Sequence, residues 1–339
     1  MKAMVLRGPR ELAFDEVARP KLSAGQVLVR VTHSGVCGTD LKIYNGAIPV
    51  GYPLIMGHEA TGEVVDAGGN EGVRTGDRVI MDPELFCGVC FQCRVGQTHL
   101  CPNGQLLGRD ANGGFAEYVA VPASHVFPLP DSIDGRVAPL IQVLTTCMHA
   151  QRLVHVFPGE SVVVMGLGVT GQLHVQLAKA RGAHPVIGIT RSASKRELAE
   201  SLGADLTIAG GPGAIEKVVE ATHGRGADLI VETTGVVASL SDAVTMARVG
   251  GRILMFGIIT AKEGALPFYQ LYFKELALIN ARVAKPEDYP NSIDLVERGI
   301  VRLEPLVSNV MQLGELNEAI GMLGSDNGQR MKIILEHAR

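Results

Sequence analysis

The stretch Ser161-Val162-Val163-Val164-Met165-Gly166-Leu167-Gly168-Val169-Thr170-Gly171 decides the fold of the second part of the chain. Its apolar, β-branched run is typical of a buried parallel strand, and the glycines that follow are typical of a tight strand-to-helix turn. Gly166, Gly168 and Gly171 let the backbone approach a ligand, and Val169 and Thr170 lie between them. The helix predicted over residues 172–181 would present its N-terminus to a pyrophosphate. The pattern therefore predicts a dinucleotide-binding Rossmann unit, with an ordinary glycine-rich turn as the alternative.

The sequence after this turn keeps alternating between strand and helix patterns. Strands are predicted over residues 185–189, 205–208, 228–232, 251–256 and 276–281, and helices over residues 195–202, 213–223 and 239–248. This alternation favours a doubly wound parallel α/β sheet spanning roughly residues 150–286. From residue 290 we expect a helix, a short strand, a second helix and a closing strand over residues 331–335, which fold back on the first domain.

The first part of the chain has the alternating patterns of short β-strands. They cover residues 4–6, 26–31, 62–68, 76–81 and 113–121 and are separated by glycine and proline turns. A helix is predicted over about residues 136–153. We therefore expect a β-rich domain made of residues 1–149 and 287–339, with a cysteine-rich lobe at about residues 82–104.

Composition excludes several classes of function. The chain has 339 residues, 46% hydrophobic and 19% charged, which favours two ordinary globular domains. A net charge of -4 with few aromatics and no Trp argues against nucleic-acid partners. No apolar run is long enough to span a membrane and no signal peptide is evident, so we expect a cytoplasmic protein. In that reducing compartment, six cysteines favour metal binding or catalysis over disulfides.

Three side chains suited to zinc follow one another closely in the β-rich part. They are Cys37, His58 and Glu59, and the hydroxyl of Thr39 lies two residues after the thiol. A thiolate, an imidazole and a carboxylate suit a borderline-soft ion, and three protein ligands would leave one position open for substrate. The alternative is that the cysteine and the histidine are buried packing residues.

A second cluster contains four cysteines, three of them on one short loop. Cys87, Cys90, Cys93 and Cys101 have the spacing of a closed, structural zinc site. A redox Cys-x-x-Cys pair would leave two cysteines unexplained, and a nucleic-acid-binding zinc finger would need more basic residues than Arg94. The sequence therefore predicts two zinc ions per chain, one catalytic and one structural.

The residues after the second Rossmann strand favour NADP(H) over NAD(H). An NAD site places Asp or Glu at the end of that strand to bind the ribose hydroxyls. Here Thr190, Arg191 and Ser192 stand at that place, with Lys195 and Arg196 one turn further on. Hydroxyls can donate to a 2′-phosphate and Arg can pair with it. A solvated basic helix start is the alternative.

These motifs together resemble the zinc-dependent medium-chain dehydrogenase/reductase family over essentially the whole chain. The resemblance rests on Gly-Val-Cys37-Gly-Thr39-Asp40, on Gly57-His58-Glu59-Ala-x-Gly62, on the four cysteines and on the nucleotide-binding turn. It is greatest to the branch of sorbitol, threonine and glucose dehydrogenases. It implies a GroES-like catalytic domain, an inserted Rossmann domain, a cleft between them, and a homodimer or homotetramer.

The resemblance also assigns roles to single residues. Cys37 and His58 would hold the catalytic zinc, with Glu59 ligating directly or moving in during turnover, and Gln142 stands at the remaining ligand position. Asp40 would orient the histidine and Thr39 would relay the substrate proton. Lys42 replaces a histidine of the relay, so either it or water would serve as the outer base. Thr234 and Gly257, which follow the fourth and fifth Rossmann strands, would contact the cofactor. Cys147 is expected to be a packing residue, and His149, which matches a histidine of the polyol relatives, a buried hydrogen-bonded residue.

The sequence thus predicts a zinc-dependent oxidoreductase that transfers a hydride between NADP(H) and an alcohol/carbonyl pair. We expect the substrate to be a small secondary alcohol, polyol or sugar, in a pocket near Tyr44, Ile48, Phe86 and Lys285. Two alternatives stay open: an NAD-dependent polyol dehydrogenase, and a non-catalytic NADP(H)-binding protein that retains the scaffold. A zinc-free quinone or enoyl reductase would lack both sets of zinc ligands.

Overall fold

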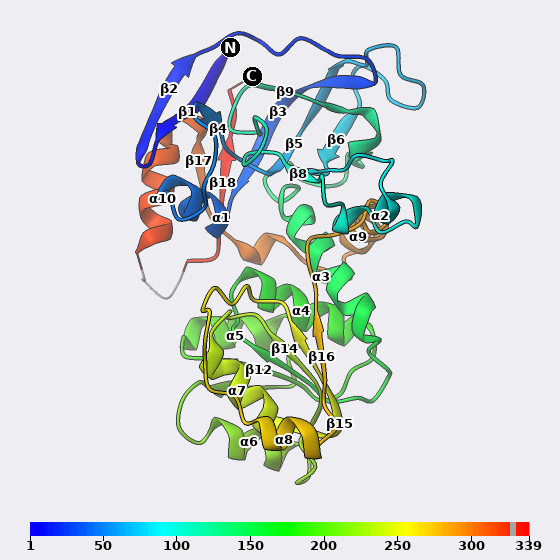
Figure 1. Ribbon diagram of the computed structural model, residues 1–339, viewed down its shortest axis with the longest axis vertical. Coiled ribbons are helices and arrows are strands. Elements are labelled where there is room, and N and C mark those ends of the chain that lie inside the picture. The colour runs from blue at the N-terminus through cyan, green and yellow to red at the C-terminus, as the bar shows by residue number, and fades with distance from the viewer. Residues whose placement is uncertain (326–329, 339) are drawn as a thin grey trace. The chain divides into compact units, whose positions relative to one another are not determined.

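The computed structural model describes residues 1–325 and 330–338, and its chain forms two compact units (Figure 1). The β-rich unit comprises Met1–Thr145, Lys285–Arg298 and Leu303–Arg339. The Rossmann unit comprises Thr146–Ala284 and Gly299–Arg302. The division within the first long helix, α3 (Leu140–Val154), falls between Thr145 and Thr146.

Three sheets form the β-rich unit. The largest has the order β10-β6-β5-β3-β18-β17 with β9 also paired to β3; a smaller one has the order β2-β1-β4, and β7 pairs with β8. Val27, Val29 and Val31 alternate along β3 into a buried core, as expected of a strand with one covered face. The strands are β1 (Lys2–Gly8), β2 (Glu11–Glu16), β3 (Gln26–Val36), β4 (Leu54–Ile55), β5 (Glu59–Asp66), β6 (Arg78–Met81), β7 (Glu84–Leu85), β8 (Gln105–Leu106), β9 (Tyr118–Pro122), β10 (Val126–Pro128), β17 (Val307–Gln312) and β18 (Lys332–Glu336).

The C-terminal strand completes the large sheet from the far end of the chain. In Figure 1, β18 (red) lies beside β3 (blue), and the two pair antiparallel with Ile333 opposite Val36. On its other side β3 pairs with β5, where Gly35 lies opposite Glu59. Residues far apart in sequence are therefore adjacent at this end of the sheet.

The helices of the unit are α1 (Gly38–Tyr44), α2 (Phe91–Arg94), α9 (Asp288–Glu297) and α10 (Leu316–Gly324), with short 3₁₀ turns η1 (Thr98–Leu100), η2 (Ala123–His125), η3 (Glu304–Leu306) and η4 (Leu313–Glu315).

The Rossmann unit is a six-stranded parallel sheet in the order β13-β12-β11-β14-β15-β16. Val162 and Val164 of β11 face one core, while Val163 and Met165 face another, so both faces of the sheet are buried. Helices α4 and α5 pack on the first face, and α6 and α7 supply residues to the second core. The elements are β11 (Val162–Met165), α4 (Val169–Ala180), β12 (Val186–Thr190), α5 (Ala193–Ser201), β13 (Leu206–Ala209), α6 (Ala214–Ala221), β14 (Ala227–Glu232), α7 (Val237–Met246), β15 (Ala247–Met255), α8 (Phe268–Phe273) and β16 (Ala277–Asn280).

The predicted α/β class is confirmed, while several element boundaries were wrong. Helix α4 begins at Val169, inside the glycine motif, because Gly168 is its N-cap. Helix α3 begins at Leu140, and α7 ends at Met246, where the chain runs directly into β15. Helices α1 and α8 were not predicted. Within the described residues, no helix is both long and apolar enough to cross a membrane.

Candidate metal and cofactor sites

Cys37, His58 and Glu59 come together where β3, β5 and α1 meet. Cys37 caps the N-terminus of α1 directly after β3, Glu59 is the first residue of β5, and His58 directly precedes it. One potential ligand atom from each lies within 4.8 Å of the other two. All three residues belong to the β-rich unit. A thiolate, an imidazole and a carboxylate at this separation fit the donor set of a zinc ion.

Asp40 connects two of these residues. It is fully buried in the first turn of α1, where its Oδ2 accepts a hydrogen bond of 2.8 Å from the Cys37 backbone N–H. Its other oxygen, Oδ1, lies 3.5 Å from Nδ1 of His58. Because Nδ1 faces the carboxylate, Nε2 is the ring nitrogen left to face a metal. A carboxylate behind a histidine ligand fixes its tautomer and orientation.

Glu59 has a buried cationic partner. Nζ of Lys332, the first residue of β18, lies 2.8 Å from Oε1 and 2.7 Å from Oε2 of Glu59. Burial lowers the pKa of Lys332, but the negative charges of Glu59 and Cys37 outweigh this, and the pKa is raised. Burial likewise lowers the pKa of His58, while Asp40 and Cys37 raise it well above the usual value. Cys37 and Asp40 contribute to raising both pKa values, and Glu59 contributes to that of Lys332.

The other residues predicted for this site lie on two helices. Thr39 and Lys42 are one turn apart on α1; Thr39 is partly buried and Lys42 is exposed. Gln142 is buried in the first turn of α3. Its role as a ligand stays a prediction, as do the roles of Thr39 and Lys42. Of the residues predicted for the pocket, Phe86 lines an apolar cavity of about 630 Å³ within the β-rich unit, together with Leu54, Ile55 and His125.

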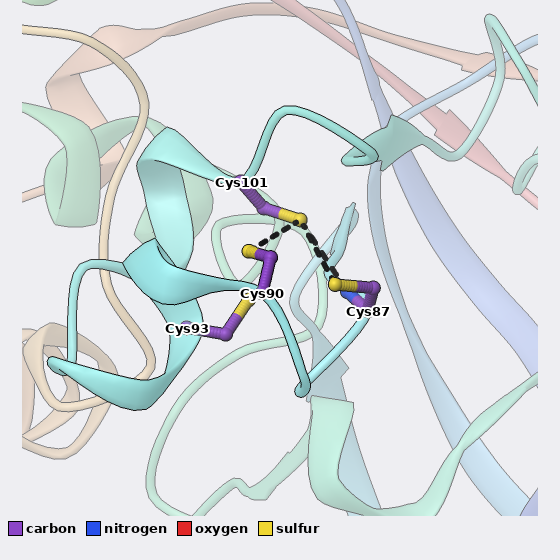
Figure 2. Close-up of side chains that lie close together, drawn as sticks. All are labelled: Cys87, Cys90, Cys93 and Cys101. Carbon is purple, nitrogen blue, oxygen red and sulfur yellow. Dashed lines mark hydrogen bonds between the residues drawn. The ribbon is translucent and has the colours of Figure 1, made fainter.

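The four cysteines form a second cluster (Figure 2). One sulfur from each lies within 4.8 Å of the other three; the Cys101 sulfur is 3.6 Å from that of Cys87 and 3.8 Å from that of Cys90. Four Zn–S bonds of about 2.3 Å in a tetrahedron place the sulfurs about 3.8 Å apart, which matches these separations. All four thiols are free.

The surroundings of these cysteines shift the pKa values of two thiols in opposite directions, because burial raises the pKa of Cys93 to about 12. Backbone N–H groups of Val89 and Cys90 stabilise the Cys87 thiolate and lower its pKa to about 6. Side-chain nitrogen Nδ2 of Asn103 also lies 3.9 Å from this sulfur. The remaining thiols would lose their protons when a cation binds, because metal binding and deprotonation are coupled. Cys147, by contrast, is buried on α3 and burial raises the pKa of its thiol, as expected of a packing residue.

The glycine motif forms the tight turn between β11 and α4. Gly166 has a φ of +87°, and a Cβ there would lie 2.7 Å from the Thr233 hydroxyl. A Cβ on Gly171 would lie 1.9 Å from the Gly166 carbonyl oxygen, so only glycine fits. The N-terminus of α4, with Val169 and Thr170 in its first turn, therefore lies directly against the end of β11. This geometry is suited to a pyrophosphate.

The other predicted cofactor residues gather at the same edge of the sheet. Register places Met165 opposite Ile189 and Glu232, and Glu232 opposite Met255, so the carboxyl ends of four strands are level. Thr234 and Gly257 follow two of these ends. Glu232 fixes the backbone at Thr234, because its carboxylate accepts hydrogen bonds from the Thr234 N–H and from the Gly235 N–H.

The residues after β12 differ in their freedom to bind a phosphate. Thr190 ends the strand, Ser192 is the N-cap of α5, and Arg191 between them is exposed. Arg196 is not free, because its Nη1 donates to the carbonyl oxygens of Thr190 and Arg191 at 3.1 and 3.0 Å. Lys195 is partly buried in the same first turn. Arg191 is thus the exposed cation next to the end of β12.

Sequence reasoning missed two residues of the first site. Lys332 was seen only as part of an apolar closing strand, and Gly35 was not given a role. A lysine within Met331-Lys332-Ile333-Ile334-Leu335 was the available signal, since an unpaired ammonium in a buried strand is costly. Its partner could not be identified without knowing that β18 pairs with β3.

Comparisons with known proteins agree with this arrangement. Residues 23–131 match the alcohol dehydrogenase GroES-like domain, and residues 169–298 match the zinc-binding dehydrogenase domain. An NAD-dependent alcohol dehydrogenase of Sulfolobus acidocaldarius is 35% identical, over 95% of this chain and 96% of the relative. The chain belongs to the zinc-type medium-chain dehydrogenase/reductase family. The predicted family is therefore confirmed, and so is the GroES-like and Rossmann architecture.

Two further relatives of this dehydrogenase show the range of the family. A sorbitol dehydrogenase of Halalkalibacterium halodurans is 31% identical over 99% of both chains. A protein of Sinorhizobium meliloti 1021, solved bound to NADP, is 31% identical with a TM-score of 0.92, over 99% of this chain and 98% of that one. This dehydrogenase is thus an oxidoreductase of the alcohol and polyol type, and both NAD and NADP occur among its relatives.

Proposed function

We propose that this chain is a zinc-dependent dehydrogenase that interconverts a small secondary alcohol, polyol or sugar and the corresponding carbonyl compound, with NADP(H) as the hydride carrier. The observation that carries the proposal is the convergence of Cys37, His58 and Glu59 within 4.8 Å, backed by Asp40. The four-cysteine cluster supports a second, structural zinc. An NAD-dependent polyol dehydrogenase and a non-catalytic dinucleotide-binding protein are the competing functions.

The preference for NADP(H) is supported by the charge at the end of β12. Thr190, Arg191 and Ser192 place hydroxyls and an exposed guanidinium where an NAD enzyme has a carboxylate. A guanidinium can pair with a 2′-phosphate through two charge-assisted hydrogen bonds, whereas it gains less from a ribose hydroxyl.

Zinc would act as a Lewis acid on the alcohol or carbonyl oxygen, and the dinucleotide would exchange a hydride with the substrate carbon. The chain's own residues would position these groups and move the proton. Asp40 accepts a hydrogen bond from the Cys37 backbone, and its other oxygen lies 3.5 Å from Nδ1 of His58, where it would orient the ring. The Thr39 hydroxyl, partly buried on the same helix, would pass the substrate proton outward. Lys42, exposed one turn later, or a water molecule would receive it.

Replacing Cys37 by Ser tests the proposal. We expect the zinc content to fall from two ions per chain to one, and turnover of alcohols to be lost, because the thiolate ligand is gone. NADPH binding should persist, since the glycine turn belongs to the other unit. Metal analysis, fluorescence titration with NADPH and a screen of secondary alcohols, polyols and sugars measure the three quantities.

Cys147→Ala is the matched cysteine control and should keep two zinc ions, because its thiol is buried on α3. Retained turnover in Cys37→Ser would refute the metal role. Wild-type protein that binds zinc and NADPH but turns over no compound of the screen would favour the non-catalytic alternative.

We also propose that the protein is a cytoplasmic homodimer or homotetramer. Helix α8 exposes Phe268, Tyr269, Tyr272 and Phe273, each more than half exposed. The adjacent strand β16 pairs with β15 on one side only among the described strands. Exposed aromatics beside an unpaired strand edge are typical of a surface that a second copy covers. Six free thiols suit a reducing compartment.

A further inference from the structure

Lys332 is a buried lysine whose three donors all point toward the candidate metal site. Its side chain is almost fully buried, and Nζ lies 2.8 and 2.7 Å from the two Glu59 oxygens and 3.4 Å from the Val36 carbonyl oxygen. An ammonium group has three N–H donors, so this set uses its whole capacity. Val36 directly precedes Cys37 in the chain. The ammonium therefore joins one predicted ligand to the backbone that carries another.

Gly35 leaves the space in which this bridge forms. It lies opposite Glu59 in the β3–β5 pair and opposite Ile334 in the β3–β18 pair. A Cβ on Gly35 would lie only 2.1 Å from Oε2 of Glu59. The Glu59 carboxylate of β5 thus lies over the Cα of Gly35 in the central strand β3. Lys332 reaches this carboxylate from β18, on the other side of β3. Any side chain at position 35 would displace the carboxylate.

We propose that Lys332 is a positioning residue for the metal centre, and that it holds the Glu59 carboxylate back from zinc and keeps one coordination position open for substrate. Both carboxylate oxygens are engaged by Nζ, although Glu59 is close enough to Cys37 and His58 to share an ion with them. The inference rests on the function proposed above, because it takes Cys37 and His58 as zinc ligands.

The charges at the site give the direction of the effect. The Cys37 thiolate and the Glu59 carboxylate carry two negative charges, and Lys332 carries one positive charge beside them. Removing the ammonium takes a cation away from a dication and frees a carboxylate to become a ligand. Both changes strengthen zinc binding, by at least about tenfold for one unit charge a few ångströms away at partial burial. They also fill the position that substrate needs.

The experiment compares zinc affinity at the two sites of the holoenzyme by competition with a chelator. In Lys332→Met we expect the Cys37 site to bind zinc at least about tenfold more tightly, while the four-cysteine site, which serves as the internal reference, is unchanged. With Co²⁺ at the Cys37 site, the visible spectrum of the variant should differ from wild type and stop responding to added alcohol. Lys332→Arg, which keeps the charge, and Lys2→Met, which removes an exposed lysine of the same unit, should both resemble wild type.

A double-mutant cycle with Glu59→Gln separates positioning from a merely structural role. If Lys332 acts through the carboxylate, adding Lys332→Met to Glu59→Gln gives a clearly smaller gain in zinc affinity than adding it to wild type, because only the removal of a nearby cation still contributes. Unchanged or weaker zinc binding in folded Lys332→Met, or an equal gain in both backgrounds, would overturn the inference. If the Met variant does not fold, Lys332→Gln, which also removes the charge, replaces it in the same measurements of zinc affinity. Wild-type protein that binds zinc only at the four-cysteine site would overturn the proposed function and this inference together.

Discussion

Asp82 is a buried carboxylate whose surroundings make it titrate near neutral pH. It follows β6 and is 2% exposed. Burial raises its pKa to about 7 against the opposing effect of the Glu84 N–H, which donates to it at 3.0 Å. The charge of Glu84 raises the pKa, and so does that of Asp288; the Tyr289 hydroxyl, 3.4 Å away, lowers it. The folded protein therefore keeps a proton on Asp82 that the unfolded chain has lost.

Asp82→Asn should stabilise the protein more at alkaline than at acidic pH. The pKa of Asp82 in the folded protein lies above the unfolded value of 3.8. The contribution of its proton to the free energy of unfolding therefore decreases as the pH rises from about 4, and it is lost above about pH 7. The loss amounts to a few kcal/mol, roughly 1.4 per unit of pKa. Asparagine carries no charge and keeps an oxygen for both donors. In scanning calorimetry, we expect the melting temperature of the variant to exceed that of wild type by about 5 °C at pH 8, with a clearly smaller difference at pH 5.

The control is Asp131→Asn, since the side chain of Asp131 is 98% exposed. It should change the melting temperature by a small amount that does not depend on pH. A gain in Asp82→Asn that is equal at pH 5 and pH 8 would show that Asp82 does not carry this pH dependence.

Sequence identified residues whose chemistry is self-evident, and missed those whose role depends on their neighbours. Cys37, His58 and Glu59 were singled out by ligand type, and the structure brings them within 4.8 Å of one another. Lys332 and Gly35 have no recognisable motif, because they matter only through the pairing of β3 with β5 and β18. A partner on a different strand is visible only in three dimensions.

Among the elements, the turn between β12 and α5 carries the proposed choice of cofactor. Arg191→Ala should raise the KM for NADPH by about ten- to a hundredfold, the cost of one charge-assisted interaction with a phosphate. The KM for NADH should stay unchanged, because that cofactor lacks the 2′-phosphate. Steady-state kinetics with each cofactor measures the two KM values in the variant and in wild type.

Arg225→Ala is the matched control, because this exposed arginine precedes β14 at the opposite, amino-terminal edge of the sheet. It should leave both KM values unchanged. Thr190→Asp, which places a carboxylate at the end of β12, should shift the preference toward NADH. A lower KM for NADH than for NADPH in the wild-type enzyme would contradict the proposed preference for NADP(H).

Elements with strong periodicity were predicted, and short ones were not. The runs that form β11, β12 and β14 are continuous and β-branched, and all three strands were placed within about two residues of their bounds. Helix α1 has only seven residues, starts at a glycine and is held by Asp40 on the Cys37 N–H, so its sequence is also that of a turn. Helix α8 is a run of six residues, four of them aromatic, which has no helical period to recognise.

For the whole molecule, the exposed face of α8 predicts that the chain self-associates. Tyr272→Lys places a charge among the four aromatics, where a second copy would have to bury it. We expect light scattering to show a dimer or tetramer for wild type and a smaller species for the variant. Phe157→Lys, which alters an exposed aromatic that is not part of α8, should leave the mass unchanged. A monomeric wild-type protein at micromolar concentration would contradict the proposal.

The overall fold class could be predicted from sequence because the pattern of apolar residues changes near Glu160. Before it the apolar residues recur with the period of short antiparallel strands, and after it buried strands alternate with helices. Preferred substrate and assembly were not accessible. They depend on surfaces that segments distant in the sequence form together, and no short motif describes such a surface.

The insertion of β18 beside β3 also has a consequence for biosynthesis. Glu59 and Lys332 are 273 residues apart, so a ribosome adding about 5 to 20 residues per second makes the lysine roughly 14 to 55 s after the glutamate. During that interval a nascent chain carries the thiol, the imidazole and the carboxylate without their ammonium neighbour. We expect the ion to be captured most tightly in this window, before translation ends. Zinc retention on ribosome-bound chains stalled before and after β18 emerges would measure the difference.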